Sequence, residues 1–246
     1  MPIRGTITLP GDKSISHRAL MLASLTDGNC VIHNISTGED VETTRNCLSQ
    51  CGIASSKEGA TVYITGGTIK TPEQVLDCRN SGTSIRLMSG MLAGLPFSVT
   101  LDGDESIRKR PMERIIEPLE RMGATISCLK TAGRAPFRID AGGLKGIEYQ
   151  MEVPSAQVKG CVLFAGLSAQ GPTTVIEAVP STSVNEPPDD GSITDTSSAV
   201  RPSGTIDGTG EGSVGAGVAA TAAATVTEVA VDPDFVICFV MVASAA

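Results

Sequence analysis

Three short segments of this chain each join small polar residues to the start of an apolar run, and together they could bind an anion. They read GDKSISHR from Gly11, RNSGTSIR from Arg79 and VPSAQVK from Val153. Asp, Asn and Ser are preferred helix N-caps. A helix N-terminus offers unpaired N–H groups and roughly half a positive charge. Three such termini that converge would form a strong site for an oxyanion or a phosphate.

Side chains in the first two openings suit this chemistry. Asp12 or Ser14 can cap the first helix, while Lys13 and Arg18 bracket its first turn with positive charge. In the second opening, Gly82 permits a close approach of the backbone. Taken singly, a serine is more often a plain N-cap, and a lone Lys or Arg is usually a solvated charge. The three openings occupy equivalent positions in one repeat, and this favours their interpretation as an anion-binding site.

Further candidates lie in the third opening and in a charged loop. Ser155 can cap the third helix. The loop DGDESIRKRPM is either a solvated surface loop or a means of aiming Arg110 at a carboxylate or phosphate. His17 and His33 have no Ser or Cys at a spacing that suggests a catalytic pair. We therefore interpret His17 as a spectator and not as a general base.

The openings belong to a repeat with a period of about 70 residues. Leu25, Leu95 and Leu167 end the three apolar helices at this spacing, and residues 48–52 match residues 119–123. A period this long indicates repeated supersecondary units that pack round a shared core.

Hydrophobic periodicity predicts helices at 16–26, 40–51, 84–95, 111–122 and 157–168. Segments rich in β-branched residues predict strands at 30–33, 61–65, 97–101, 125–128, 137–140 and 173–177. Pro111 is expected in the first turn of the fourth helix, and Pro118 inside that helix is unfavourable and can kink it. The first, third and fifth helices are apolar nearly all round, which predicts burial. We expect an inside-out α/β domain of three β-α-β-α-β-β units, with these helices inside and the strands outside.

Charge and composition divide the chain near residue 183. Residues 1–180 carry 18 Lys and Arg against 18 Asp and Glu, so the formal charge of −8 arises beyond them. Residues 184–230 contain no Leu, Lys or aromatic residue and are rich in Gly, Ser, Thr, Ala and acids. Such a composition buries too little apolar surface to offset chain entropy. We predict a domain at 1–183 and an acidic tail of low complexity at 184–246 that is disordered or loosely docked.

Composition also argues against several functional classes. The neutral body lacks the basic stripe that binds nucleic acid. Seven cysteines without a CxxC pair argue against a zinc or redox site, and their odd number without a secretory signal indicates a reducing cytoplasm. No apolar run reaches the ~20 residues of a membrane span. We expect a cytoplasmic protein with no metal, nucleic acid or membrane partner.

Four motifs together resemble one enzyme family. GDKSISHRALMLASL, NSGTSIRLMSGMLAG, the loop ending in KRPM, and VPSAQVKGCVLFAGL are similar in order and spacing to 3-phosphoshikimate 1-carboxyvinyltransferases, also called 5-enolpyruvylshikimate-3-phosphate synthases. The resemblance covers about residues 3–183. It implies two inside-out α/β domains that close on the substrates. It also implies transfer of the enolpyruvyl group of phosphoenolpyruvate to the 5-hydroxyl of shikimate 3-phosphate, in the shikimate pathway, without metal or organic cofactor.

The resemblance also assigns roles to individual residues. For shikimate 3-phosphate it implies contacts from Lys13, Ser14, Arg18, Ser155, Ala156, Gln157 and Ser183. For phosphoenolpyruvate it implies contacts from Lys13, Gly82, Arg110 and Gln157. These assignments agree with the anion sites inferred from residue types. The two substrates are the expected partners, and the protein is expected to be a monomer.

Beyond Ser183 the chain departs from the family pattern. Val184 stands where a polar residue followed by Asp-His-Thr-Glu would be expected, and the helix that the repeat places near residue 190 is missing. The family's second domain supplies a general base, a Lys–Glu pair and further binding residues. None of these can be placed here, so we identify no catalytic residue and expect the chain to be incomplete.

Two alternatives remain open. The chain could be a half-site that binds shikimate 3-phosphate without turnover. It could instead belong to the sister family that transfers enolpyruvate to UDP-N-acetylglucosamine. That family places a reactive Cys in the loop that here reads DGDESIRKRP, which contains none.

Overall fold

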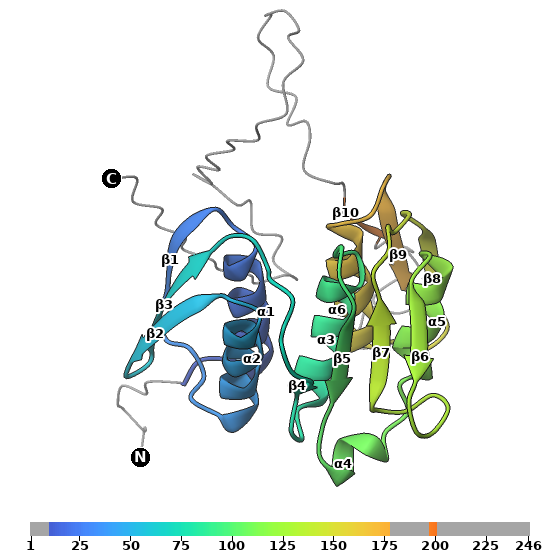
Figure 1. The fold of residues 1–246 in the computed structure, drawn as a ribbon. Helices are drawn as coiled ribbons and strands as arrows, with labels where there is room; N and C mark the ends of the chain where they lie inside the picture. The colour runs from blue at the N-terminus through green and yellow to red at the C-terminus, as the bar shows by residue number, and fades with distance from the viewer. Residues whose placement is uncertain (1–9, 178–196, 201–246) are drawn as a thin grey trace, which may run out of the picture.

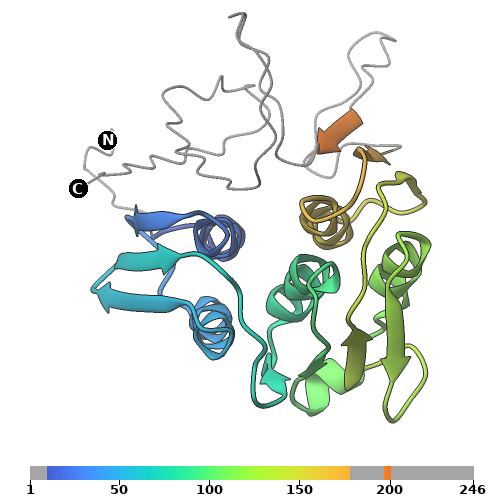
Figure 2. The ribbon, with the colours of Figure 1, turned by 45° about the horizontal axis from the view of Figure 1, so that its top comes forward.

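The computed structural model describes residues 10–177 and 197–200, and it contains three small sheets with helices between them. The ribbon in Figure 1 places the sheets towards the outside of the molecule. The turned view in Figure 2 shows the helices gathered on the inside. The predicted inside-out α/β arrangement is therefore confirmed.

The first unit consists of two helices packed on one antiparallel sheet. Its elements are α1 (Lys13–Ser24), β1 (Gly28–Ile32), α2 (Glu39–Gln50), β2 (Ala54–Glu58) and β3 (Thr61–Gly66). The strand order is β1-β3-β2, with both pairs antiparallel. Both helices lie on the inner side of this sheet (Figure 2).

The second unit repeats this plan with two additions. Its elements are β4 (Leu76–Asp77), α3 (Gly82–Ala93), β5 (Val99–Asp102), α4 (Glu105–Arg108), α5 (Glu113–Arg121), β6 (Thr125–Cys128) and β7 (Phe137–Asp140). The strand order is β4-β5-β7-β6, in which β4 and β5 are parallel and the other pairs antiparallel. The additions are the two-residue strand β4 and the one-turn helix α4.

The third unit is shorter within the described residues. It consists of β8 (Glu148–Met151), α6 (Ala156–Gly166), β9 (Thr173–Glu177) and β10 (Ser197–Val200). β8 and β9 are parallel, and β10 pairs antiparallel with β9. The part of this unit that the structure describes contains no counterpart of α2 or α5.

The interior helix α3 explains why apolar helices lie inside. Of its 12 residues, all but Arg86 are buried. A Cβ at Gly90 would lie 2.0 Å from the carbonyl oxygen of Cys161 in α6, and a Cβ at Gly160 would lie 2.6 Å from Leu87 Cδ2. The two helices therefore approach more closely than larger side chains would permit. Small residues at the crossing bring their backbones together.

The predicted elements are present, with small differences at their ends. All five predicted helices and all six predicted strands occur, most of them shifted by one to three residues. The additional strands β2, β4 and β8 were not predicted, because β2 is polar, β4 is very short and β8 alternates Glu and Gln with two buried residues. α4 lies in the segment that we predicted as a loop, where Asp104 caps its single turn.

Pro111 lies outside α5, the helix that corresponds to the fourth predicted one, and Pro118 lies within it. The fourth predicted helix begins at Glu113, so Pro111 precedes it instead of forming its first turn. The backbone N–H of Met112, the N-cap residue, donates to the carbonyl oxygen of Gly133, which holds this entry outside the helix. Helix α5 continues through Pro118, which is buried and whose carbonyl oxygen still accepts from Met122.

The predicted tail falls almost entirely outside the described residues. Only Ser197–Val200 is described, as strand β10 on the free edge of β9. The sequence reading did not predict this strand, since Ser, Ser and Ala give it little β propensity. The position near residue 190 and Ser183 also lie outside the described residues. The boundary at residue 183 stays a prediction. None of the helices that the structure describes is long and apolar enough to cross a membrane.

Candidate anion-binding site

The helices α1, α2 and α3 run parallel, with their N-termini at one end of the domain. Lys13 Nζ lies 2.8 Å from Asp40 Oδ2, and one turn further along both helices His17 Nδ1 lies 2.7 Å from Thr44 Oγ1. Ser84 Oγ, in the first turn of α3, lies 3.3 Å from the carbonyl oxygen of Asp40. The starts of the three helices are therefore at the same level.

Helix α6 joins this arrangement through a shared glutamine. Gln157 Nε2 donates to Thr83 Oγ1 at 3.1 Å, and Gln157 Oε1 accepts from Arg86 Nη1 at 2.9 Å. Further along both helices, Gly90 meets Cys161. The contacts again advance in the same direction, so α3 and α6 are parallel. The three predicted openings do converge on one end of the domain.

Each opening has a side-chain cap. Asp12 Oδ1 accepts from the backbone N–H of Ile15 at 2.7 Å, which makes Asp12 the cap of α1. Ser81 Oγ accepts from Ser84 N–H at 3.2 Å, and Ser155 Oγ accepts from the N–H of Val158 at 3.4 Å. Each cap satisfies one of the unpaired donors of its helix. The remaining first-turn N–H groups have no partner within their own helix.

Ser14 has a different position from that of a cap. It is the second residue of α1 and is exposed, as is Ala156, the first residue of α6. Both residues therefore lie at the surface of the shared end, where a ligand could contact them. Between the two alternatives that the sequence left open, the structure selects Asp12.

Lys13 and Arg18, the two cations of α1, lie in different environments. Lys13 forms the ion pair with Asp40 although its side chain is 54% exposed. Arg18 is half-buried, and burial lowers its pKa, which the nearby Asp12 partly offsets. An anion at this end would compete with Asp40 for Lys13.

A pair of arginines flanks Gly82. A Cβ placed on Gly82 would lie 2.7 Å from Arg86 Nη1 and 3.0 Å from Arg110 Nη1, so the two guanidinium groups are close neighbours. Burial lowers the pKa of Arg86, and the charge of Arg110 lowers it further. Arg86 Nη2 also donates to the carbonyl oxygen of Pro111 at 3.3 Å, which brings the start of α5 to the same end.

Sequence reasoning overlooked Arg86. Arg86 closes the motif RNSGTSIR four residues after Gly82, a spacing that places both residues on one helix face and was the signal that could have found it. Its contacts connect Gln157 with the loop that carries Arg110. Arg86 is therefore part of the site that the motifs predict.

A buried hydrogen-bond network was also missed. His17 has no exposed surface, and burial lowers its pKa to about 4, with Asp40 opposing this shift. Its partner Thr44 lies 2.7 Å from Ser84 Oγ. These partners are 27 and 40 residues apart in sequence, so no local spacing could reveal them. His33, in contrast, is exposed at the end of β1 and lies 3.5 Å from Thr61 Oγ1.

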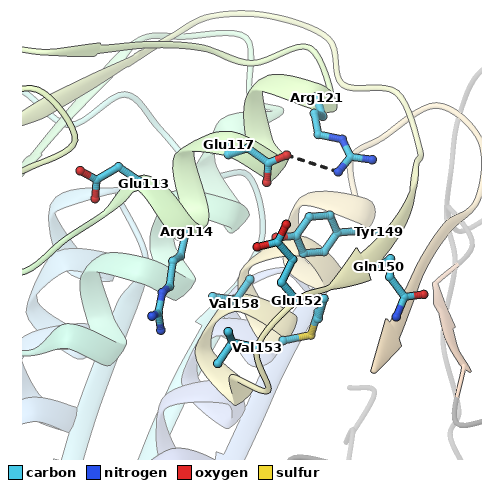
Figure 3. Close-up of a pocket in the computed structure, with 10 residues that line it drawn as sticks. Glu113, Arg114, Glu117, Arg121, Tyr149, Gln150, Glu152, Val153 and Val158 are labelled. Carbon is cyan, nitrogen blue, oxygen red and sulfur yellow. Dashed lines mark hydrogen bonds and ion pairs between the residues drawn. The ribbon is translucent and has the colours of Figure 1, made fainter. Parts of the chain in front are cut away.

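A separate pocket lies between α5, β8 and the start of α6 (Figure 3). Arg121 donates to Glu117 at 3.3 Å, and its guanidinium lies 5.4 Å from the centre of the Tyr149 ring. The lining mixes acidic and basic side chains, and Arg121 already pairs with Glu117, so we assign the pocket no ligand. Within residues 10–177 and 197–200, no group of three or more His, Cys, Asp or Glu gathers as a metal site would require.

Comparison with known proteins identifies the family of this chain. A family model described as EPSP synthase (3-phosphoshikimate 1-carboxyvinyltransferase) matches residues 1–187. This chain belongs to the EPSP synthase family. The resemblance drawn from the four motifs is thereby confirmed.

Similar proteins agree with this membership. The 3-phosphoshikimate 1-carboxyvinyltransferase of Solibacter usitatus is 48% identical over 180 residues, which cover 72% of this chain and 42% of the relative. That of Bacillus velezensis is 47% identical over 178 residues, covering 71% of this chain and 42% of the relative. The solved EPSP synthase of Acinetobacter baumannii superposes with a TM-score of 0.72 at 35% identity and covers 81% of this chain and 47% of that one. The chain therefore spans about two fifths of the length of these curated relatives.

Proposed function

We propose that this domain binds shikimate 3-phosphate at the shared end of α1, α3 and α6 and contributes that site to enolpyruvyl transfer from phosphoenolpyruvate. One observation carries the proposal. The capped N-termini of these helices lie at one level: Gln157 and Thr83 join α6 to α3, and Asp40 of α2, which contacts both Ser84 and Lys13, links α3 to α1. Aligned helix N-termini favour anions, and both substrates carry phosphate.

The residues divide the two substrates between them. Lys13, Ser14 and Arg18 of α1, together with Ser155, Ala156 and Gln157 of α6, are proposed to contact shikimate 3-phosphate. Gly82, Arg110, Lys13 and Gln157 are proposed to contact phosphoenolpyruvate. Arg86 and Thr83 bond to the oxygen and the nitrogen of the Gln157 amide and so fix Gln157, which is assigned to both substrates. Ser183 stays a proposed contact for shikimate 3-phosphate.

In the proposed reaction the 5-hydroxyl of shikimate 3-phosphate gives up its proton to a base while its oxygen forms a bond to C2 of phosphoenolpyruvate. The methylene carbon gains a proton, and the resulting tetrahedral intermediate then loses phosphate and a proton to restore the double bond. Positive charge from Lys13, Arg110 and the helix N-termini would stabilise the phosphates throughout. Positioned donors of this kind act without moving during the reaction.

We assign none of the described residues as the proton carrier for these steps. Acid and base groups each typically contribute roughly 10²–10⁴-fold to rate. His17 is fully buried, so it cannot reach a substrate atom. We therefore propose that this chain by itself binds shikimate 3-phosphate with little or no turnover. The proposal places it in the cytoplasm as a monomer with two small-molecule partners.

Calorimetry with shikimate 3-phosphate tests binding, and a phosphate-release assay with both substrates tests turnover. We expect saturable binding and no steady phosphate release. Phosphate release at 1 s⁻¹ or more, on the order of a typical enzyme, and abolished by Lys13→Ala, would show that this chain completes the site by itself. The absence of binding would contradict the proposal as a whole.

The alternative acceptor UDP-N-acetylglucosamine is tested in the same calorimeter. The names of the similar proteins favour shikimate 3-phosphate. The segment Asp102–Pro111, where the sister family places a cysteine, forms the end of β5, α4 and the entry to α5 without one. Binding of the nucleotide sugar in preference to shikimate 3-phosphate would reverse the assignment.

A further inference from the structure

A continuous chain of hydrogen bonds crosses the domain from α1 to the N-cap of α3. His17 Nδ1 lies 2.7 Å from Thr44 Oγ1, Thr44 Oγ1 lies 2.7 Å from Ser84 Oγ, and Ser84 Oγ donates to Ser81 Oγ at 2.7 Å. All four residues are fully buried. Bonds of this length are the usual ones for hydroxyl groups.

Counting protons fixes the direction of this chain. A hydroxyl has one proton to donate. Ser84 uses its proton on Ser81 Oγ at 2.7 Å, because the carbonyl oxygen of Asp40 is more distant at 3.3 Å. With that proton committed, Thr44 must be the donor to Ser84. Thr44 then has no proton left for His17, so His17 must donate from Nδ1.

The surroundings of the other ring nitrogen, Nε2, favour a neutral ring. His17 Nε2 is buried and has no hydrogen-bond partner among the described residues. The charged groups that face the ring are Asp40 of α2 and Lys13, Arg18 and Asp12 at the start of α1. A proton on Nε2 would be a buried donor without an acceptor, which costs more than a bare lone pair on a weak acceptor. The neutral ring protonated on Nδ1 satisfies the network.

The direction of the chain has a consequence for the anion site. Each donor points its hydrogen towards α3, so the O–H dipoles of Thr44 and Ser84 are aligned with their positive ends towards Ser81. Ser81 caps α3 and precedes Gly82. Aligned hydrogen bonds polarise one another in a buried environment. Their positive ends therefore add to that of the helix.

We propose that His17 is a positioning residue for the anion site: as the Nδ1–H tautomer it orients Thr44 and Ser84 so that the N-cap of α3 is held and made more positive. The inference rests on the proposed function for the identity of the anion. It assigns to the histidine of the first motif a role that does not require contact with substrate. Without the donor at Nδ1, the hydrogen bonds of Thr44 and Ser84 would no longer have a fixed direction.

Nitrogen chemical shifts of the ring test the direction without any ligand. In the full chain labelled with ¹⁵N-histidine, a long-range ¹H–¹⁵N correlation spectrum at pH 7 distinguishes a protonated nitrogen from a bare one. We expect His17 Nδ1 to be protonated and Nε2 to be bare. A proton on Nε2 would overturn the proposal, because Thr44 would then donate to His17. The exposed His33 serves as the reference ring in the same spectrum.

Binding of inorganic phosphate, followed by NMR titration of the full chain, tests the effect on the site. Thr44→Ser keeps the hydroxyl, and Thr44→Val removes it at nearly the same volume. We expect Thr44→Val to weaken phosphate binding roughly threefold to tenfold, as for the loss of one buried hydrogen bond, while Thr44→Ser does not. His17→Asn, whose amide can donate in place of Nδ1, is expected to bind better than His17→Leu.

The outcomes separate this inference from the proposed function. Equal phosphate affinity in Thr44→Val and Thr44→Ser, with both variants folded by circular dichroism, would overturn the positioning role. A wild-type chain that binds neither phosphate nor shikimate 3-phosphate would overturn the proposed function. The ring shifts would in that case still decide the direction of the chain.

Discussion

Helix α3 meets α6 on one side and α1 and α2 on the other, through contacts of different character. Against α6 the contact is polar only at the helix starts, through Gln157, and beyond them it is apolar and close, with Gly90 beside the carbonyl oxygen of Cys161 and Gly160 beside Leu87. Against α1 and α2 the contact is polar, formed by His17, Thr44 and Ser84. Both contacts are buried, so the difference in character between them does not come from solvent exposure.

The two contacts control different properties of the same site. Close packing of glycine against backbone fixes the distance between α3 and α6, because no side chain can yield at that point. A hydrogen-bond chain fixes direction as well as distance, since each hydroxyl must choose one acceptor. The α6 side therefore sets where Gln157 lies, and the α1 side sets how the α3 cap is oriented.

The largest expected effect comes from breaking the apolar contact. Gly90→Val places a Cβ 2.0 Å from the Cys161 carbonyl oxygen, where only backbone could move. We expect a loss of stability on the order of 3 kcal/mol or more, as for strong overpacking. Chemical denaturation measures it. Gly143→Ala, where nothing lies within 4 Å of the new Cβ, is the control and should change little. An unchanged midpoint for Gly90→Val would mean that α3 and α6 are not in this contact.

The polar contact should respond to pH. Burial lowers the pKa of His17 from 6.5 to about 4 in the folded state, so between these values the unfolded state binds more protons. The stabilisation is complete above pH 6.5 and is lost as pH falls towards 4, by on the order of 3 kcal/mol. The difference in unfolding free energy between wild type and His17→Asn, measured from pH 7.5 to 4, isolates this contribution. A constant difference across that range would contradict a buried neutral ring.

On the polar side of the site, Arg18→Ala should weaken shikimate 3-phosphate binding by about 1.5–3 kcal/mol, as for a charge-assisted hydrogen bond. Calorimetry measures the affinity. Lys145→Ala is the matched control, because Lys145 is exposed and its backbone N–H donates to the carbonyl oxygen of Met122, the C-cap of α5, at the end opposite the helix openings. An equal loss in both variants would show that the effect is general electrostatics.

At the start of α6, Ser155→Ala should weaken shikimate 3-phosphate binding by about 0.5–1.5 kcal/mol, since a neutral hydroxyl is lost. The cap of α6 is lost with it, so the melting temperature is measured in parallel. Ser155→Asn, which keeps a capping side chain, separates the two roles. If Ser155→Asn restores stability but not affinity, the hydroxyl contacts the ligand. If it restores both, Ser155 acts through the cap alone.

The local features of this protein could be predicted from its sequence. Helix openings depend on residues a few positions apart, such as Ser81 and Ser84 or Ser155 and Val158, and the all-apolar composition of α3 predicts its burial. The four motifs were enough to indicate the family, which the matched family model then confirmed. Short-range chemistry of this kind can be read directly because cap and helix are neighbours in the chain.

Only the tertiary structure decided which residues act together. Arg86 holds Gln157 across 71 residues, and His17 reaches Ser84 only through Thr44. No pattern in the sequence distinguishes His17 from a spectator, because its partners and its burial depend on how α1, α2 and α3 pack. Packing excludes water from this contact, and a histidine without water must find its partner in the protein or remain neutral. Residue types therefore determined what the site could bind, and the fold determined which buried groups orient it.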